Sequence, residues 1–150
     1  TPAMIDLAQK NAVTLEMNNV VFKLSQIEAL PEPDNRVDAI ISNCVINLAA
    51  NKDAVFAEAF RVLRDGGRLY VSDIVVTEEL PLDIQADVNN WTGCIAGAQI
   101  QDVYLAQMAD AGFSEIEIVT SIPTSSGGEE PWFESVRSIS VKAIKKGKQV

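Results

Sequence analysis

The residues best placed to do chemistry follow the apolar stretch at positions 37–42. That stretch has the β-branched bias of a buried strand flanked by helical crossovers, and it is too short for a helix that spans a membrane. It runs directly into a polar elbow that ends in Cys44. In an open parallel sheet, ligands bind beyond the carboxyl ends of the strands. The sequence therefore predicts a binding site at Ser42, Asn43 and Cys44.

A second strand of the same kind is predicted at residues 68–74, after a helix and a glycine turn. Asn51 is a suitable N-cap for that helix, and Gly66 with Gly67 is expected to end it by supplying positive φ. The apolar stripe of the helix comprises Val55, Phe56, Ala59, Val62 and Leu63. Strand, helix, turn and strand form one right-handed crossover, which favours a parallel α/β sheet.

The amino-terminal part is predicted to be a helix followed by a short strand. Pro2 after Thr1 begins the helix, and Asn18 with Asn19 ends it. Residues 20–24 are predicted to form the strand. The helix face expected to be buried comprises Met4, Ile5, Ala8, Ala12 and Leu15.

The carboxyl-terminal part is predicted to contain a further helix and two strands. Residues 80–98 have a weak pattern typical of broken helix, and a short amphipathic helix then ends at Gly112. Isoleucine alternates with glutamate at 115–118, which indicates a strand. A loop rich in serine and glycine at 123–131 precedes the last strand, at 136–144.

Composition limits the possible partners. The chain has 150 residues, 47% of them hydrophobic, which is enough for one domain that buries roughly two-thirds of its unfolded surface. Its 12 basic and 21 acidic side chains give a net charge of −9, which argues against a nucleic-acid partner. The basic cluster at 142–148 is interpreted as a solvated terminus.

Neither a membrane partner nor an oxidising compartment is expected. No apolar run approaches the ~20 residues that a membrane span needs, and the first residues have no signal-peptide pattern. The two cysteines lie 50 positions apart without a disulfide-dense pattern, so reduced thiols in the cytoplasm are predicted.

Three motifs resemble a known family. Residues 60–69 (FRVLRDGGRL) resemble the helix-to-strand turn of class I S-adenosylmethionine (SAM) methyltransferases. Residues 42–48 (SNCVINL), taken with residues 93–98 (GCIAGA), resemble the two cysteine motifs of arsenite methyltransferases. The resemblance covers residue 1 to about residue 145. It implies a Rossmann-like α/β sheet, mostly parallel with an antiparallel carboxyl-terminal strand.

The family's glycine-rich SAM loop, and the acid that holds the ribose, have no counterpart in the sequence. The glycines fall at 66, 67, 93, 97, 112, 127, 128 and 147, so no G-x-G-x-x-G arrangement exists. Residues 1–4 resemble the helix start that directly follows the missing acid. We therefore expect residues 1–150 to be a single partial domain, truncated so that the first two strands of the sheet are missing.

The resemblance implies methyl transfer from SAM to the lone pair of trivalent arsenic. This displacement needs positioning more than acid or base chemistry, so no catalytic side chain is assigned. Soft thiolates hold a soft centre, which makes Cys44 and Cys94 the expected arsenic ligands, with a small thiol to complete a site that prefers three sulfurs. The alternative is that both are buried apolar residues, the commonest fate of an unpaired cysteine.

For the cofactor, the resemblance implies contacts from Gln26, Ile27 and Asn43. Gln26 occupies the place of an acid that accepts a hydrogen bond from the adenine amino group, and a neutral amide accepts more weakly. Ile27 would donate its N–H to the ring and pack on it, and the Asn43 backbone would meet the methionine end. Alternatively, Gln26 is an ordinary solvated loop residue, and Ser25, in place of the family's glycine, crowds the pocket.

Two functions remain open. The chain is an arsenite methyltransferase completed by the missing amino-terminal part, or a non-catalytic, oligomerising remnant that at most binds thiophilic metalloid through Cys44 and Cys94. Each lost bond to a charged group of SAM costs about 1.5–3 kcal/mol, so SAM binding by this chain alone is expected to be weak or absent.

The missing strands would leave residues 37–42 with an open edge. A homodimer through that edge, or through exchange of residues 1–24, is therefore expected.

Overall fold

The computed structural model describes residues 1–86, 95, 97–124 and 131–147. Within them, four strands form one sheet in the order β1-β2-β4-β3. The strands are β1 (Val37–Asn43), β2 (Leu63–Val76), β3 (Ser114–Pro123) and β4 (Val136–Ile144). β1 pairs with β2 in parallel, and β4 is antiparallel to both of its neighbours. The predicted α/β fold with an antiparallel carboxyl-terminal strand is confirmed, in the form of a mixed sheet.

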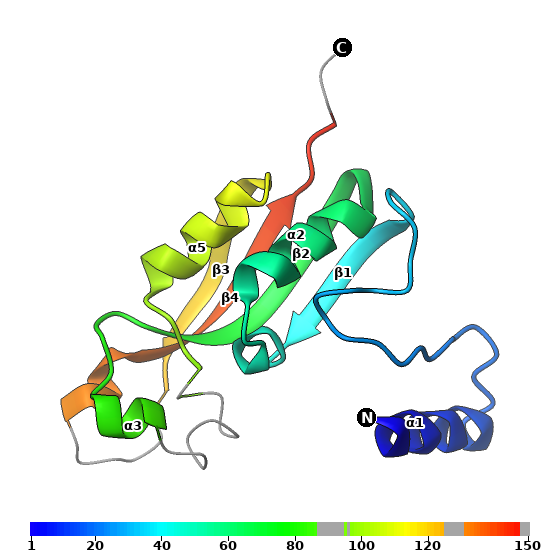
Figure 1. The fold of residues 1–150 in the computed structure, drawn as a ribbon, viewed down its shortest axis with the longest axis horizontal. Coiled ribbons are helices and arrows are strands. Elements are labelled where there is room, and N and C mark those ends of the chain that lie inside the picture. The colour runs from blue at the N-terminus through cyan, green and yellow to red at the C-terminus, as the bar shows by residue number, and fades with distance from the viewer. Residues whose placement is uncertain (87–94, 96, 125–130, 148–150) are drawn as a thin grey trace.

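Two helices cover one face of this sheet, α2 (Lys52–Val62) and α5 (Gln101–Asp110) (Figure 1). The predicted cap of α2 is confirmed, because Asn51 Oδ1 accepts a hydrogen bond from the Ala54 N–H at 3.0 Å. The predicted stop is wrong, since α2 ends at Val62 and Gly66 and Gly67 already lie within β2. Leu63 takes an extended conformation and pairs with Val37, so strand pairing ends the helix before the glycines are reached.

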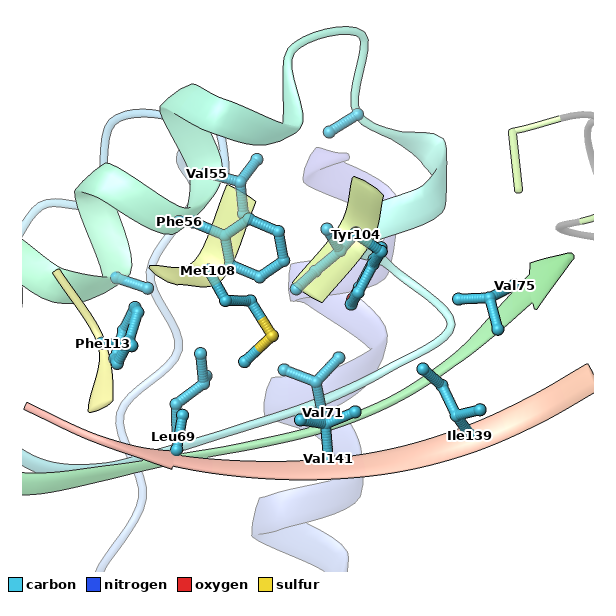
Figure 2. Packing of buried hydrophobic residues seen from close by; sticks show 14 of the residues in the cluster. Val55, Phe56, Leu69, Val71, Val75, Tyr104, Met108, Phe113, Ile139 and Val141 are labelled. Carbon is cyan, nitrogen blue, oxygen red and sulfur yellow. The ribbon is translucent and has the colours of Figure 1, made fainter. Parts of the chain in front are cut away.

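The core lies between these helices and the sheet, as Figure 2 shows. Val55 and Phe56 of α2 and Tyr104 and Met108 of α5 face the sheet residues Leu69, Val71, Val75, Ile139 and Val141. The rings of Phe56 and Tyr104 meet edge to face, with centroids 5.2 Å apart. Each fully buried apolar side chain stabilises the fold by about 1.5–3 kcal/mol. The predicted stripe of α2 is therefore the face that packs.

The carboxyl end of α2 is stabilised by a lysine that was expected to be solvated. Lys145, just after β4, is buried, and its Nζ donates to the carbonyl oxygens of Phe60 and Leu63 at 2.7 and 2.8 Å. It also donates to Asn35 Oδ1 at 2.7 Å. A cation that bonds the last carbonyls of a helix satisfies acceptors with no partner inside the helix. The interpretation of residues 142–148 as a solvated terminus is wrong at Lys145.

The amino-terminal helix α1 (Pro2–Thr14) begins where predicted but packs differently. Thr1 Oγ1 accepts from the Met4 N–H at 3.4 Å, and the helix ends at Thr14, before Asn18. It buries no residue, and Figure 1 shows it apart from the sheet. Met4 and Leu15 are 62% and 68% exposed, so the expected buried face is wrong.

The strand predicted at residues 20–24 does not form. A strand needs a partner for its backbone groups, and this segment makes no ladder with β1. It runs as irregular chain into the loop before β1 (Figure 1).

The second half of the chain largely follows the prediction. α5 closes at Gly112, which has φ +105°, and a Cβ there would lie 2.9 Å from the Phe60 ring. β3 and β4 confirm both carboxyl-terminal strands. The short helix α3 (Leu82–Ala86) lies near the start of the segment 80–98 that was expected to be broken helix. Residues 87–94 and 96 of that segment, and residues 125–130 of the 123–131 loop, lie outside the described residues. Among the described helices, none is long and apolar enough to cross a membrane.

Candidate functional site

Cys44 lies directly beyond β1 in a left-handed backbone conformation, with φ +55°. Its N–H donates to the Ser72 carbonyl at 2.9 Å, and the residue is exposed. A non-glycine residue in this conformation costs about 1–3 kcal/mol and is found disproportionately at functional sites. The structure thus presents the side chain at the carboxyl end of the parallel pair, and the alternative of a buried cysteine is wrong for Cys44.

The elbow after Cys44 is anchored by Asn47, which lies in the short helix η1 (Ile46–Leu48). Asn47 is fully buried, and its Nδ2 donates to the Ile74 carbonyl at 2.6 Å. Lys52 Nζ donates to the Asn47 carbonyl at 3.4 Å. The first cysteine motif is therefore tied both to β2 and to the start of α2.

The second cysteine motif packs on the first through Gly97. A Cβ at Gly97 would overlap the Asn47 carbonyl oxygen, so only glycine permits this approach. The two motifs, about fifty residues apart in sequence, therefore meet at Asn47 and Gly97. Cys94 itself lies outside the described residues. Within the described ranges, no group of three or more His, Cys, Asp or Glu side chains is arranged to hold a metal ion.

A buried polar cluster beneath the elbow was not predicted. Asp73 is 1% exposed, and its Oδ2 accepts from the Tyr104 hydroxyl at 3.2 Å. Burial raises the pKa of Asp73 and lowers the pKa of Lys52, whose charge acts on the same carboxylate. One signal could have found it, because alternation along β2 puts Asp73 on the same inward face as Val71 and Val75. An acid at such a position needs a buried partner.

The predicted cofactor residues fall in two places. Gln26 is exposed in a tight turn in which the Ala29 N–H donates to the Gln26 carbonyl at 3.2 Å, and Ile27 packs against the core. Asn43 is exposed at the carboxyl end of β1. These groups are chemically suited to SAM. The Gln26 amide and the Ile27 side chain could contact an adenine ring, and the Asn43 backbone could contact an amino-acid tail.

An open groove of about 580 Å³ lies between the segment that carries this turn and the outer edge of β1. Ser25 and Leu30 line it from the segment, and Ile41 lines it from the strand. β2 pairs with the other edge of β1, so on this side no described strand covers it.

Residues 1–127 match a methyltransferase domain. An arsenite methyltransferase of Halobacterium salinarum is 46% identical over 118 residues, which are 79% of this chain and 30% of the relative. The human arsenite methyltransferase is 37% identical over 109 residues, covering 71% of this chain and 29% of the relative. The structure of an arsenic(III) SAM methyltransferase from Chlamydomonas reinhardtii matches with a TM-score of 0.87 and 27% identity, over 100% of this chain and 55% of that chain.

The fold and the matched domain define a class I, SAM-dependent methyltransferase domain. Within that class, the chain belongs to the arsenite methyltransferase family. It spans about 30% of the length of the curated relatives it matches. The resemblance carried by residues 42–48, 60–69 and 93–98 is confirmed at the level of the family.

Proposed function

We propose that this chain provides the arsenic-binding elbow of an arsenite methyltransferase, with Cys44 and Cys94 as thiolate ligands of the trivalent arsenic substrate. The observation that carries the proposal is the exposed, left-handed Cys44 at the end of β1. The contact between Gly97 and Asn47 supports it, because it joins the two cysteine motifs. A small thiol would supply the third sulfur that arsenic(III) prefers.

In this proposal the protein holds and orients the arsenic, and the methyl transfer itself requires no proton transfer. When bound, SAM supplies a methyl group already activated on a sulfonium. The arsenic lone pair carries no proton, so the absence of histidine from the sequence is no obstacle. When a cysteine binds arsenite, an As–S bond forms, an As–OH bond breaks, and the hydroxide leaves as water with the thiol proton. Cys44 would then hold the arsenic at the end of β1, and the elbow would orient it for transfer.

The cofactor contacts we propose are an adenine hydrogen bond to the Gln26 amide oxygen, packing on Ile27 and a backbone contact from Asn43. A neutral amide binds more weakly than a carboxylate. We expect the 150-residue chain to bind SAM in the high micromolar range or above and to give no detectable methylation of arsenite with a thiol reductant. A dissociation constant near one micromolar, or turnover by the purified chain, would contradict this.

Thiol protection tests the arsenic site directly. One equivalent of arsenite with one equivalent of glutathione is expected to protect both cysteines from alkylation by iodoacetamide, as read by mass spectrometry of the intact chain. Protection of neither cysteine would refute the site, and protection of Cys44 alone would remove Cys94 from it. Thiolate chemistry of this kind requires a reducing compartment, which is why we place the chain in the cytoplasm.

We also propose that the chain forms a homodimer. In the described residues the outer edge of β1 has no strand partner, and Ile41 is 83% exposed beside it. The α1 side chains Met4, Leu7 and Val13 are exposed as well. Pairing of two such edges, or exchange of residues 1–24, would cover these surfaces. Light scattering should give about twice the 16.3 kDa of one chain, and a monodisperse monomer would refute the dimer.

A further inference from the structure

The loop before β1 is held to α2 by one cluster of charged side chains. Glu58 Oε1 accepts from the Leu30 N–H at 2.6 Å. Arg61 Nη2 donates to the carbonyl oxygens of Leu30 and Glu32 at 3.3 and 2.8 Å. Arg61 Nη1 donates to Asp34 Oδ1 at 2.6 Å. Glu58 and Arg61 thus hold three residues of the loop, and three of these four hydrogen bonds involve backbone atoms of the loop.

Glu58 and Arg61 also fix each other. Arg61 donates through Nε and Nη2 to the two Glu58 oxygens, both at 2.7 Å, in a bidentate pair. The hydrogen bond from Arg61 lowers the pKa of Glu58, and Glu58 raises the pKa of Arg61, so both stay charged at neutral pH. The rigid guanidinium fork spreads its donors over several acceptors at once, which an ammonium on a flexible stem cannot match.

The anchored residues directly adjoin the turn that carries the proposed adenine contacts. Leu30 follows Ala29, whose N–H closes the turn onto Gln26. Ile27, inside the turn, packs against the core. The turn is therefore fixed on one side by the apolar contact of Ile27 and on the other by the Glu58–Arg61 pair, and the Gln26 side chain on it is exposed.

We propose that Glu58 and Arg61 are positioning residues for the adenine of the cofactor, because they set the place and orientation of the turn that carries Gln26 and Ile27. This inference rests on the adenine-binding role proposed above for Gln26. The two residues touch no cofactor atom themselves. They act by removing the freedom of the loop before the ligand arrives, so binding does not have to order it.

The first measurement needs no ligand. Amide hydrogen exchange over residues 26–34 is expected to be at least about tenfold faster in Arg61→Met than in the wild type, because the loop loses the Arg61 bonds to the Leu30 and Glu32 carbonyls and Glu58 loses the partner that orients it. Arg64→Met is the matched control. Arg64 forms an ion pair with Asp38, on β1, instead of with the loop, and should leave loop exchange unchanged. If Arg61→Met does not fold, Arg61→Lys, which keeps the charge and loses the fork, is measured in its place.

The second measurement separates positioning from general stability. S-adenosylhomocysteine and its 6-deamino purine analogue are titrated into each variant by calorimetry. Arg61→Met is expected to weaken the adenine probe at least about fivefold and to bring the affinity ratio of the two probes close to one. Glu58→Gln, which keeps an oxygen for the Leu30 N–H, should fall between Arg61→Met and the wild type. A merely structural role would lower the unfolding temperature and leave the ratio unchanged.

The outcomes distinguish this inference from the proposal beneath it. Unchanged loop exchange in Arg61→Met overturns the inference. Faster exchange with an unchanged probe ratio overturns it too, provided that Gln26→Ala lowers the ratio. A wild type that binds neither probe, or a Gln26→Ala variant with wild-type affinity for both, overturns the adenine role of Gln26 and the positioning role with it.

Discussion

Helices α1 and α2 begin alike and end up in different surroundings. They have 13 and 11 residues, and each starts with a side-chain oxygen that accepts from a backbone N–H three residues on. α2 buries five residues, whereas α1 buries none. The local signals that start a helix are thus present in both, and only α2 has a sheet face to cover.

The two helices mark two different regions of the molecule, a packed region around α2 and a solvent-exposed region around α1. The α2 side contains the packed core and the polar cluster under the elbow. The α1 side contains exposed apolar residues and irregular chain. Cys44 shares a feature with each region: it is exposed, as α1 is, but its backbone N–H is hydrogen-bonded to β2. The consequence is that substitutions of the same chemical kind should differ greatly in effect between the two sides.

The largest difference is expected for core truncation. Phe56→Ala should lower the unfolding free energy by about 3–5 kcal/mol, because the ring is fully buried against Tyr104. Leu7→Ala, in exposed α1, should change it by less than about 0.5 kcal/mol. Urea unfolding followed by circular dichroism measures both. A loss above about 1 kcal/mol in Leu7→Ala would mean that α1 is packed in solution.

Removal of the N-cap side chains of α1 and α2 should produce a smaller difference in stability. Asn51→Ala should cost about 1 kcal/mol of global stability, because α2 unfolds with the core. Thr1→Ala removes a similar bond from α1 and should reduce helical circular dichroism without moving the urea midpoint. Equal midpoint shifts in the two variants would break the comparison.

Cys44 itself should be a site of strain. Cys44→Gly should raise the unfolding free energy by about 1 kcal/mol, because glycine adopts positive φ without the Cβ penalty. Glu16 also has positive φ, at +54°, but it follows α1, so Glu16→Gly should leave global stability unchanged. A destabilised Cys44→Gly would contradict the expected release of strain.

The smallest effect is a pH dependence at Asp73. Burial raises the pKa of Asp73, so the folded chain holds this proton more tightly than the unfolded chain does. The resulting stability is present below the ordinary carboxyl pKa and is lost as pH rises through the raised value. Asp73→Asn, which keeps an oxygen for the Tyr104 hydroxyl, should therefore gain stability relative to wild type as the pH rises from the ordinary carboxyl pKa through the raised pKa of Asp73. Asp6→Asn, on exposed α1, controls for a general charge effect, and a flat difference at Asp73 would contradict its burial.

Elements that are determined by residues close together in the sequence could be predicted from it. β1, α2 and the last strand β4 each have a periodic apolar pattern with a local cap or turn, and all three formed. The packing of α1 and the strand at 20–24 depended on a partner surface, which local patterns do not specify. For the same reason Lys145 was misread, because its acceptors lie 82 to 110 residues away in the sequence.

The candidate site also has features that the sequence predicted and features that it could not predict. The place of Cys44 followed from the rule that parallel strands carry ligands at their carboxyl ends, and the structure puts it there. The Tyr104–Asp73 bond joins residues 31 apart, so the sequence could flag Asp73 as unusual but could not name its partner. The binding roles of Cys44, Cys94, Gln26, Ile27 and Asn43 stay predictions.

The proposed arsenic site at Cys44 and Cys94 is tested most directly by one titration. Arsenite is added to the wild type, Cys44→Ser and Cys94→Ser at a fixed glutathione concentration, with circular dichroism to verify that each variant is folded. Both variants should bind at least about tenfold more weakly than the wild type, because each loses one of two protein thiolates. Equal affinity in all three proteins would contradict the assignment of arsenic to these cysteines.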